Sequence, residues 1–310
     1  MQDVTSLFAG RVLRGVAIVG RMRFAIGTRL VQAGQEGIVT TGKVDFTSVR
    51  WGSVEWTNLV TLYLRAHESR SRHPILGDHA AADAVARIDY DFKRIHRNSL
   101  PASNQYLVAL RAKQLDVWCA DFLSHHPDAV VLHLGAGLDG RAFRLDLPPA
   151  VLWFDLDQPS VIELRRRLYE ETERYKMIGS SVTESSWLDQ IPSGRPTLVV
   201  AEGLLMYVEE SAVRELFARV LDRFDCGELQ FDTLSALAPL LSKVLTRGII
   251  RWGIGNARDI ETWNPKLRLV EQTPAQAGYE KIDSTVVRWI YRFFNASPFG
   301  PYDTLNRFAF

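Results

Sequence analysis

Residues 130–145 read VVLHLGAGLDGRAFRL, and this stretch decides the fold. Its first part is a largely apolar run that stops at Gly135 and Gly137. An apolar run bounded by glycine is typical of a buried parallel strand whose backbone turns sharply into the next segment. Glycines at such a turn let a ligand lie directly against the main chain, where a side chain would collide with it. The stretch therefore predicts a strand followed by a binding turn for a nucleotide-type cofactor.

The chain on either side of this stretch indicates the fold class. Apolar runs VLWFDL, TLVVA and ELQFDTL follow VVLHL, with helix-like segments over 161–174 and 211–223 between them. Strands that alternate with helices predict an α/β fold, a doubly wound and mostly parallel sheet with helices on both faces. Residues from about 54 to 125 have helical periodicity, and residues 305–310 could form a final edge strand.

These patterns divide the chain into three parts. Residues 1–43 form a basic extension that ends in a linker, and residues 44–126 form a helical cap. Residues 127–310 form a Rossmann-like domain with a helical insertion at about 235–300.

Composition excludes several classes of protein. The 310 residues carry a net charge of +1, which gives no electrostatic case for nucleic acid as a partner. Cys119 and Cys226 lie far apart and show no metal-ligand spacing, so we expect neither a disulfide framework nor a metal site, and a cytoplasmic location.

The N-terminal 35 residues carry five arginines against one acidic residue. Arginines interrupt every apolar run, which excludes a transmembrane helix there, and the longest apolar run is too short for a signal peptide. Two alternatives remain open for residues 1–35: contact with an anionic membrane surface, or an ordinary surface helix with solvated arginines.

Two acidic positions follow predicted strands at the edge of the sheet where such folds bind ligands. Asp157 lies 20 residues beyond Gly137, where a carboxylate can accept hydrogen bonds from both hydroxyls of a ribose. It could instead cap the helix that begins near Pro159, and Asp155 points the same way along the strand. Glu202 needs a donor or a cation, either a ligand sulfonium or ammonium group or a protein arginine.

Arg111 is the most unexpected residue of the cap. It shares one helical face with Leu107, Leu115, Trp118 and Phe122. An arginine in an apolar stripe must find an anion because it cannot lose its charge. A ligand carboxylate or phosphate would serve, and so would a protein carboxylate.

GAGLDG also satisfies the pattern G-x-G-x-x-G, so an NAD(P)-dependent oxidoreductase is one alternative. Its position in the middle of the chain, and the absence of an obvious hydride-transfer set of residues, argue against this reading.

Three motifs in sequence order carry a resemblance to a known family. LHLGAGLDGRAFRL, WFDLDQPSVIELRRRL and VVAEGLLMYV resemble the leucine carboxyl methyltransferase superfamily, in particular its bacterial tetracenomycin-type polyketide O-methyltransferases. The likeness covers about residues 44–290. One departure is Gly140, where the family usually has Thr.

The resemblance implies a class I methyltransferase fold and S-adenosyl-L-methionine as the cofactor. It implies that Arg111 holds the methionine carboxylate, and that Glu202 lies near the methionine part. Asp157 would bind the ribose hydroxyls and Tyr207 would line the acceptor side, while Arg65 is a conceivable second anchor. The backbone turn that approaches the methionine part would be Gly135, Ala136 and Gly137, and the adenine would contact Ser181 and Val182.

The implied reaction is O-methylation of a hydroxyl or carboxyl group on a small aromatic, polyketide or lipid-like molecule. A member that binds the cofactor without turnover is a further alternative, because of the departure at Gly140. The aromatic residues of the cap and of the insertion could line an acceptor pocket or simply pack as core. A carboxylate acceptor needs no general base, a hydroxyl acceptor needs one, and the sequence does not single out a residue for that role.

Overall fold

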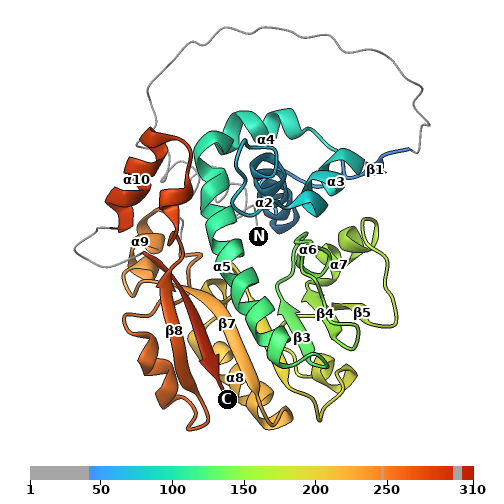
Figure 1. The fold of residues 1–310 in the computed structure, drawn as a ribbon, viewed down its shortest axis with the longest axis vertical. Coiled ribbons are helices and arrows are strands. Elements are labelled where there is room, and N and C mark those ends of the chain that lie inside the picture. Colours follow the sequence, from blue (N-terminus) through green and yellow to red (C-terminus); the bar gives the residue numbers. More distant parts are fainter. Residues whose placement is uncertain (1–41, 246–247, 296–301) are drawn as a thin grey trace, which may run out of the picture.

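The computed structural model describes residues 42–245, 248–295 and 302–310, and a seven-stranded sheet forms its centre (Figure 1). The strand order is β5-β4-β3-β6-β7-β9-β8. The first five of these strands are parallel, and β9 runs antiparallel to both β7 and β8. The expected doubly wound, mostly parallel sheet is therefore confirmed. The strands are β3 (Val130–Leu134), β4 (Leu152–Asp157), β5 (Tyr175–Gly179), β6 (Thr197–Ala201), β7 (Gly227–Leu234), β8 (Arg268–Pro274) and β9 (Asp303–Ala309).

Strand β3 lies between β4 and β6, and all five of its residues are buried. This position explains its largely apolar sequence, since both faces of a central parallel strand are covered. The chain reverses direction across the sheet beside β3, so its carboxyl end lies at the point where open α/β sheets bind ligands.

Helices cover both faces of the sheet. On one face, Val131, Trp153 and Leu198 of the sheet pack with residues of the cap helices and of α7. On the other face, the alternate strand residues pack with α8 and with the short helices η2 and η4. The covering helices are α2 (Val54–Glu68), α3 (His79–Arg87), α4 (Phe92–Ser99), α5 (Pro101–His125), α6 (Arg141–Arg144), α7 (Pro159–Arg166), α8 (Glu210–Arg223), η2 (Ser186–Gln190) and η4 (Ala257–Thr262).

Residues 44–126 hold the helices α2 to α5, together with a short two-stranded sheet of β1 (Val44–Asp45) and β2 (Ile88–Asp89). Helix α5 is long, and it crosses the molecule from the cap to the sheet (Figure 1). Its upper part contacts α10 (Thr285–Asn295), where the rings of Tyr106 and Tyr291 meet edge to face. Because α5 spans this distance, it can carry a cap residue to the ends of the sheet strands.

Three expectations about local structure differ from the structure, and one strand was not expected. Residues 305–310 belong to β9, which lies inside the sheet between β7 and β8 and is not an edge strand. The region expected to be a helical insertion holds the edge strand β8 in addition to α9 (Ala238–Leu245) and α10. The helix expected over 161–174 ends at Arg166, and strand β5 was not anticipated at all. Strands at the sheet edges are short or polar, so their hydrophobic pattern is weak.

The expectations for residues 1–35, and the linker before Gly42, fall almost entirely outside the described ranges. Across the part of the chain that is described, no helix combines the length and the apolar character needed to span a bilayer.

Candidate active site

The turn after β3 has a backbone that only glycine fits. Gly135 and Gly137 have φ angles of 63° and 51°, in the left-handed region. A Cβ at position 135 would lie 2.9 Å from Cδ1 of Leu204, and one at position 137 would lie 2.8 Å from Oδ1 of Asn58. Ala136 between them is buried, and its N–H donates to the carbonyl of Leu156 at 3.2 Å. The turn is thus packed tightly against β4, the cap and the loop after β6.

Asp157 ties this turn to the end of β4. Its Oδ2 accepts a hydrogen bond from the N–H of Gly137 at 2.8 Å, and its Oδ1 accepts from the N–H of Gln158 at 2.7 Å. Helix α7 has Gln158 as its N-cap, so the interpretation of Asp157 as the helix cap is wrong. Burial raises the pKa of Asp157, while the hydrogen bond from Gly137 opposes that rise. The side chain keeps partial exposure and unused lone pairs, as a ribose-binding carboxylate requires.

Asp155 points to the same face of β4 but is fully buried. Its Oδ2 accepts from Nε of Arg165 at 2.9 Å and from the hydroxyl of Tyr175 at 2.5 Å, and His133 Nδ1 lies 2.9 Å from Oδ1. Burial would raise the pKa of Asp155, but Arg165 outweighs it and holds the pKa at about 2. Arg165 also donates to the carbonyl of Gly137 at 3.0 Å. Asp155 therefore supports the turn from behind, and Asp157 is the carboxylate that a ligand can reach.

Arg111 reaches the same edge of the sheet from α5. Its Nε donates to Oε1 of Glu202 at 3.0 Å and its Nη1 to Oδ2 of Asp232 at 2.9 Å, with Asp303 at 3.8 Å. Its Nη2 lies beside Gly203, whose φ is 66° and where a Cβ would come within 3.3 Å of that nitrogen. The structure thus pairs Arg111 with protein carboxylates, one of the two alternatives, while glycine at 203 leaves room over Nη2.

Glu202 lies between two arginines. Besides Arg111, the Nη2 of Arg141 donates to its Oε2 at 2.6 Å. Burial would raise the pKa of Glu202, but the two guanidinium groups outweigh burial and hold the pKa below its ordinary value. Each carboxylate oxygen accepts one hydrogen bond, so Glu202 orients the two arginines and keeps further lone pairs that a ligand donor could use.

A buried ion network continues from Arg141 under the glycine turn into the cap. Arg65 belongs to this network, with its Nε 3.3 Å from Oδ2 of Asp78 and a side chain that is 5% exposed. That position gives Arg65 a partner inside the protein rather than a place in the open site. The other members are Asp116, Asp139 and Arg144, which link Asp78 to Arg141.

The adenine-side and acceptor-side candidates lie on opposite sides of this centre. The N–H of Ser180 donates to the carbonyl of Asp157 at 3.0 Å, which brings half-buried Ser181 and buried Val182 alongside the end of β4. Tyr207, on η3 (Leu205–Tyr207), is 42% exposed, yet burial raises the pKa of its hydroxyl to about 12. Arg111, Asp232 and Asp303 act electrostatically on that hydroxyl, so Tyr207 lies beside the Arg111 cluster.

Sequence reasoning missed four residues of this site: Asn58, Gly203, Asp232 and Asp303. Asp232 had a signal, because it is an acid inside the predicted strand ELQFDTL, where an unpaired charge would be costly. Asp303 begins β9 and faces Leu234 across the ladder, a pairing that depends on topology.

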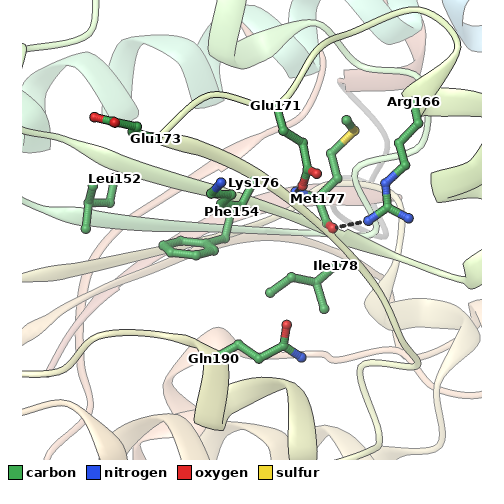
Figure 2. A pocket seen from close by; sticks show the side chains of 9 residues that line it. All are labelled: Leu152, Phe154, Arg166, Glu171, Glu173, Lys176, Met177, Ile178 and Gln190. Carbon is green, nitrogen blue, oxygen red and sulfur yellow. Dashed lines mark hydrogen bonds between the residues drawn. The ribbon is translucent and has the colours of Figure 1, made fainter.

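A separate hollow of about 480 Å³ lies over the β4–β5 edge of the sheet (Figure 2). Its lining includes Leu152 and Phe154 of β4, and alternation along β4 turns these two side chains away from Asp155 and Asp157. None of the predicted site residues lines it, so this hollow is distinct from the candidate active site.

Comparisons with known proteins show the family of the chain and support its fold. The leucine carboxyl methyltransferase family model matches residues 58–221. The tetracenomycin polyketide synthesis O-methyltransferase TcmP of Streptomyces glaucescens is 45% identical, over 73% of this chain and 84% of the relative. The S-adenosyl-L-methionine-dependent methyltransferase dpfgK of Gibberella zeae is 32% identical, over 74% of this chain and 84% of the relative. The crystal structure of a candidate methyltransferase from Thermobifida fusca YX has a TM-score of 0.51 at 16% identity, over 79% of this chain and 93% of that chain, which supports the fold alone.

Proposed function

Because the chain belongs to the leucine carboxyl methyltransferase family and is an S-adenosyl-L-methionine-dependent methyltransferase, we propose that it methylates an oxygen of a small aromatic, polyketide-type molecule. The relative TcmP carries the words polyketide and O-methyltransferase in its name and shares 45% identity, which supports this choice of acceptor. The alternative of an NAD(P)-dependent oxidoreductase is overturned by the family membership.

One observation carries the site assignment within this proposal. A glycine turn closed by Asp157 and the partly exposed side chain of Arg111, whose Nη2 lies beside Gly203, are at the same edge of the sheet. The turn suits the nucleoside part of the cofactor, with Asp157 on the ribose hydroxyls. Arg111 suits the carboxylate of the amino-acid part, since its Nη2 faces the space that Gly203 leaves open.

In this mechanism the protein holds the reacting atoms in line. When bound, the cofactor supplies a methyl group already activated by a positively charged sulfur. The residues around it fix the orientation of the two reactants, which can lower the barrier by up to about 7–11 kcal/mol. With its pKa raised to about 12, Tyr207 stays protonated at neutral pH, so it can donate a hydrogen bond to the acceptor but is not the base. A carboxylate acceptor reacts without losing a proton, whereas a hydroxyl acceptor must give up its proton, to water in the site, as its oxygen takes the methyl group.

The surroundings of Tyr207 favour an apolar acceptor. The N–H of Arg251 donates to the carbonyl of Met206 at 2.8 Å, and Met206 packs with Leu234 and Ala238 at the start of α9. This packing places α9 next to η3. The exposed apolar residues of this region are Leu237, Leu240, Leu241, Val244 and Tyr302. A flat or greasy molecule could dock on such a surface, whereas a highly charged one would gain little from it.

The proposal includes a cytoplasmic location and a small-molecule acceptor. The location rests on the sequence, in which Cys119 and Cys226 lie far apart and show no disulfide or metal-ligand spacing.

Methyl transfer from S-adenosyl-L-methionine to a panel of phenolic, polyketide and fatty-acid acceptors tests the function. We expect a product heavier by one methyl group whose new carbon is bonded to oxygen, identified by mass spectrometry and NMR. Arg258→Gln, on an exposed surface away from the site, is the matched control for protein quality. Transfer to nitrogen or carbon would contradict the O-methylation, and NAD raising the melting temperature where S-adenosylhomocysteine does not would contradict the cofactor.

A further inference from the structure

Helix α9 turns its larger apolar side chains outward. Its small residues Ala238 and Ser242 are buried against the protein, whereas Leu240 is 62% exposed and Val244 is 79% exposed. Both exposed side chains share one helical face with Leu237, which directly precedes the helix and is also exposed. The apolar face of α9, which would ordinarily pack into a core, is therefore its outer face.

Helix α10 has apolar residues on two opposite faces. Its inner face packs on α5, where Tyr291 lies in one cluster with Tyr106. Its outer face carries Val286 and Trp289, which are 71% and 61% exposed, followed by exposed Phe293. Apolar residues scattered singly over a surface are ordinary, but apolar residues gathered along one helical face indicate a contact surface.

The outer faces of the two helices border the acceptor side of the proposed site. In Figure 1 both helices lie to the left of α5, away from β4 and β5. Helix α9 begins at Ala238, which packs with Met206, the neighbour of Tyr207. Helix α10 packs in a cluster with Leu110, which directly precedes Arg111 on α5. A partner that covers these outer faces would therefore lie close to the acceptor side.

The charged residues of these two helices have one sign. The chain as a whole is balanced, with 37 basic and 36 acidic residues. Residues 237–245 and 285–293 contain Lys243, Arg288 and Arg292 and no acidic residue. Lys243 and Arg292 are exposed, and Cζ of Arg292 lies 4.9 Å from the centre of the Trp289 ring. The two outer faces therefore combine protruding apolar side chains with positive charge.

This combination is complementary to an anionic lipid surface. Trp and Phe favour the boundary between lipid headgroups and acyl chains, and Lys and Arg favour negatively charged headgroups. We propose that the outer faces of α9 and α10 dock on a membrane surface that contains anionic phospholipid. A second copy of this chain is a poorer partner, because an interface between two identical faces would place positive charge against positive charge.

Docking at this place has a consequence for the acceptor. An apolar molecule concentrates in a lipid bilayer, since transfer out of water is favourable for it. With α9 on the membrane surface, such a molecule would enter the site next to Tyr207 without first dissolving in water. This consequence rests on the proposed function, whereas the docking itself does not.

Co-sedimentation of the full chain with lipid vesicles tests the docking. We expect binding to vesicles of phosphatidylglycerol and phosphatidylcholine in equal parts, and much weaker binding to phosphatidylcholine alone. Added salt should weaken the first, because it screens the charges. Arg292→Gln should weaken it about fivefold through the lost charge, and Val244→Ser about threefold through the lost apolar contact. The matched controls are Arg258→Gln in η4 and Val54→Ser in α2, which make the same changes at exposed positions elsewhere.

Trp289 reports directly on contact with lipid. Brominated acyl chains should quench its fluorescence when the protein is bound to vesicles. Trp289→Phe should bind vesicles within about twofold of the wild type, because phenylalanine keeps an apolar ring, and it should lose most of this quenching. All these variants change exposed side chains, so their melting temperatures should equal that of the wild type.

Three results would overturn the inference. The first is vesicle binding that is unchanged in both Arg292→Gln and Val244→Ser, and the second is quenching that is unchanged in Trp289→Phe. The third is a wild type that binds neither kind of vesicle; self-association of that protein in sedimentation velocity, lost in Trp289→Ser, would then assign the outer faces to a second copy. None of these results depends on methyl transfer, so each would leave the proposed function intact.

Discussion

The two halves of the site are built from opposite electrostatic arrangements. Behind the glycine turn, Asp155 and Arg165 form a fully buried pair of equal and opposite charge. Every oxygen of Asp155 accepts hydrogen bonds, and Arg165 uses a further donor on the turn itself. At the other half, Arg111 is shared among three carboxylates, and Oδ1 of Asp303 has no partner within the described part of the chain.

This electrostatic difference indicates that the Asp155–Arg165 pair stabilises the fold and that the Arg111 cluster takes part in ligand binding. A charge pair with all its hydrogen bonds made gains nothing from a further partner, so the Asp155 side is complete without the cofactor. In the Arg111 half, a buried carboxylate oxygen of Asp303 has no donor among the described residues, so an incoming donor would add an interaction there. Substitutions in the first half should therefore act mainly on stability, and substitutions in the second mainly on binding.

The largest expected effect is on stability, from Asp155→Asn. The amide keeps the shape of the side chain but leaves Arg165 as a buried charge without its counter-charge. Removing one partner of a buried pair typically costs about 3–5 kcal/mol. Chemical denaturation of the variant should show a loss of this size in the free energy of unfolding.

The exposed change Asp222→Asn on α8 should stay within about 0.5 kcal/mol of the wild type in the same denaturation experiment. If Asp155→Asn were equally mild, the pair behind the turn would not hold the fold, and the contrast between the two halves would disappear.

The next effect is on binding, from Arg111→Gln. Loss of the guanidinium should weaken S-adenosylhomocysteine by about 100-fold, because the amino-acid carboxylate loses a charge-assisted partner. The variant should lose less stability than Asp155→Asn, since Asp303 and Asp232 can take up protons in the partly open cluster. Calorimetry and denaturation on the same preparation check both statements.

Two comparisons sharpen the Arg111 result. Binding of 5′-methylthioadenosine, which lacks the amino-acid part of the cofactor, should be preserved, and Arg258→Gln, an exposed arginine in η4, should bind both ligands as the wild type does. Equal loss of both ligands in Arg111→Gln would mean that Arg111 holds the whole site together, and would contradict its assignment to the amino-acid part.

The sequence predicts the glycine-turn half of the site better than the Arg111 half, because the first depends on local spacing and the second on long-range contacts. Gly135, Gly137 and Asp157 lie within one short strand–helix–strand unit, from β3 through α6 to β4, so their spacing alone indicates a binding turn. Arg111 and Glu202 are visible only as charges in apolar surroundings, and their mutual contact depends on how α5 crosses the sheet.

Asp303 shows where sequence reasoning ends. It reaches Arg111 because β9 inserts between β7 and β8, an antiparallel placement that no local pattern reports. The expected fold class depends on repeated strand and helix signals, and it was confirmed. The order of the last two strands depends on long-range pairing, and the expectation of an edge strand there was wrong.

Gly140 lies between the glycine turn and Arg141, the first residue of α6 and a member of the ion network. Its φ is −89°, which any residue can adopt, so its backbone does not require glycine. A Cβ at this position would lie 3.0 Å from Cβ of Ala80 and 3.4 Å from the hydroxyl of Tyr169. That hydroxyl is buried and has no hydrogen-bond partner among the residues the structure covers.

The smallest expected effect distinguishes two substitutions at Gly140. Gly140→Ala adds a tight contact with Ala80, whereas Gly140→Ser adds the same contact together with a hydroxyl that can pair with Tyr169. We expect the serine variant to be more stable than the alanine variant by about 1 kcal/mol, the usual net value of one hydrogen bond. In a Tyr169→Phe background this difference in stability should vanish, since the partner hydroxyl is gone. Urea denaturation of the alanine and serine variants, each with and without the Tyr169→Phe change, measures the difference.

Both Gly140 variants should bind S-adenosylhomocysteine as the wild type does, because position 140 faces the ion network behind the turn. Weaker binding in either variant would place Gly140 within the ligand-binding half.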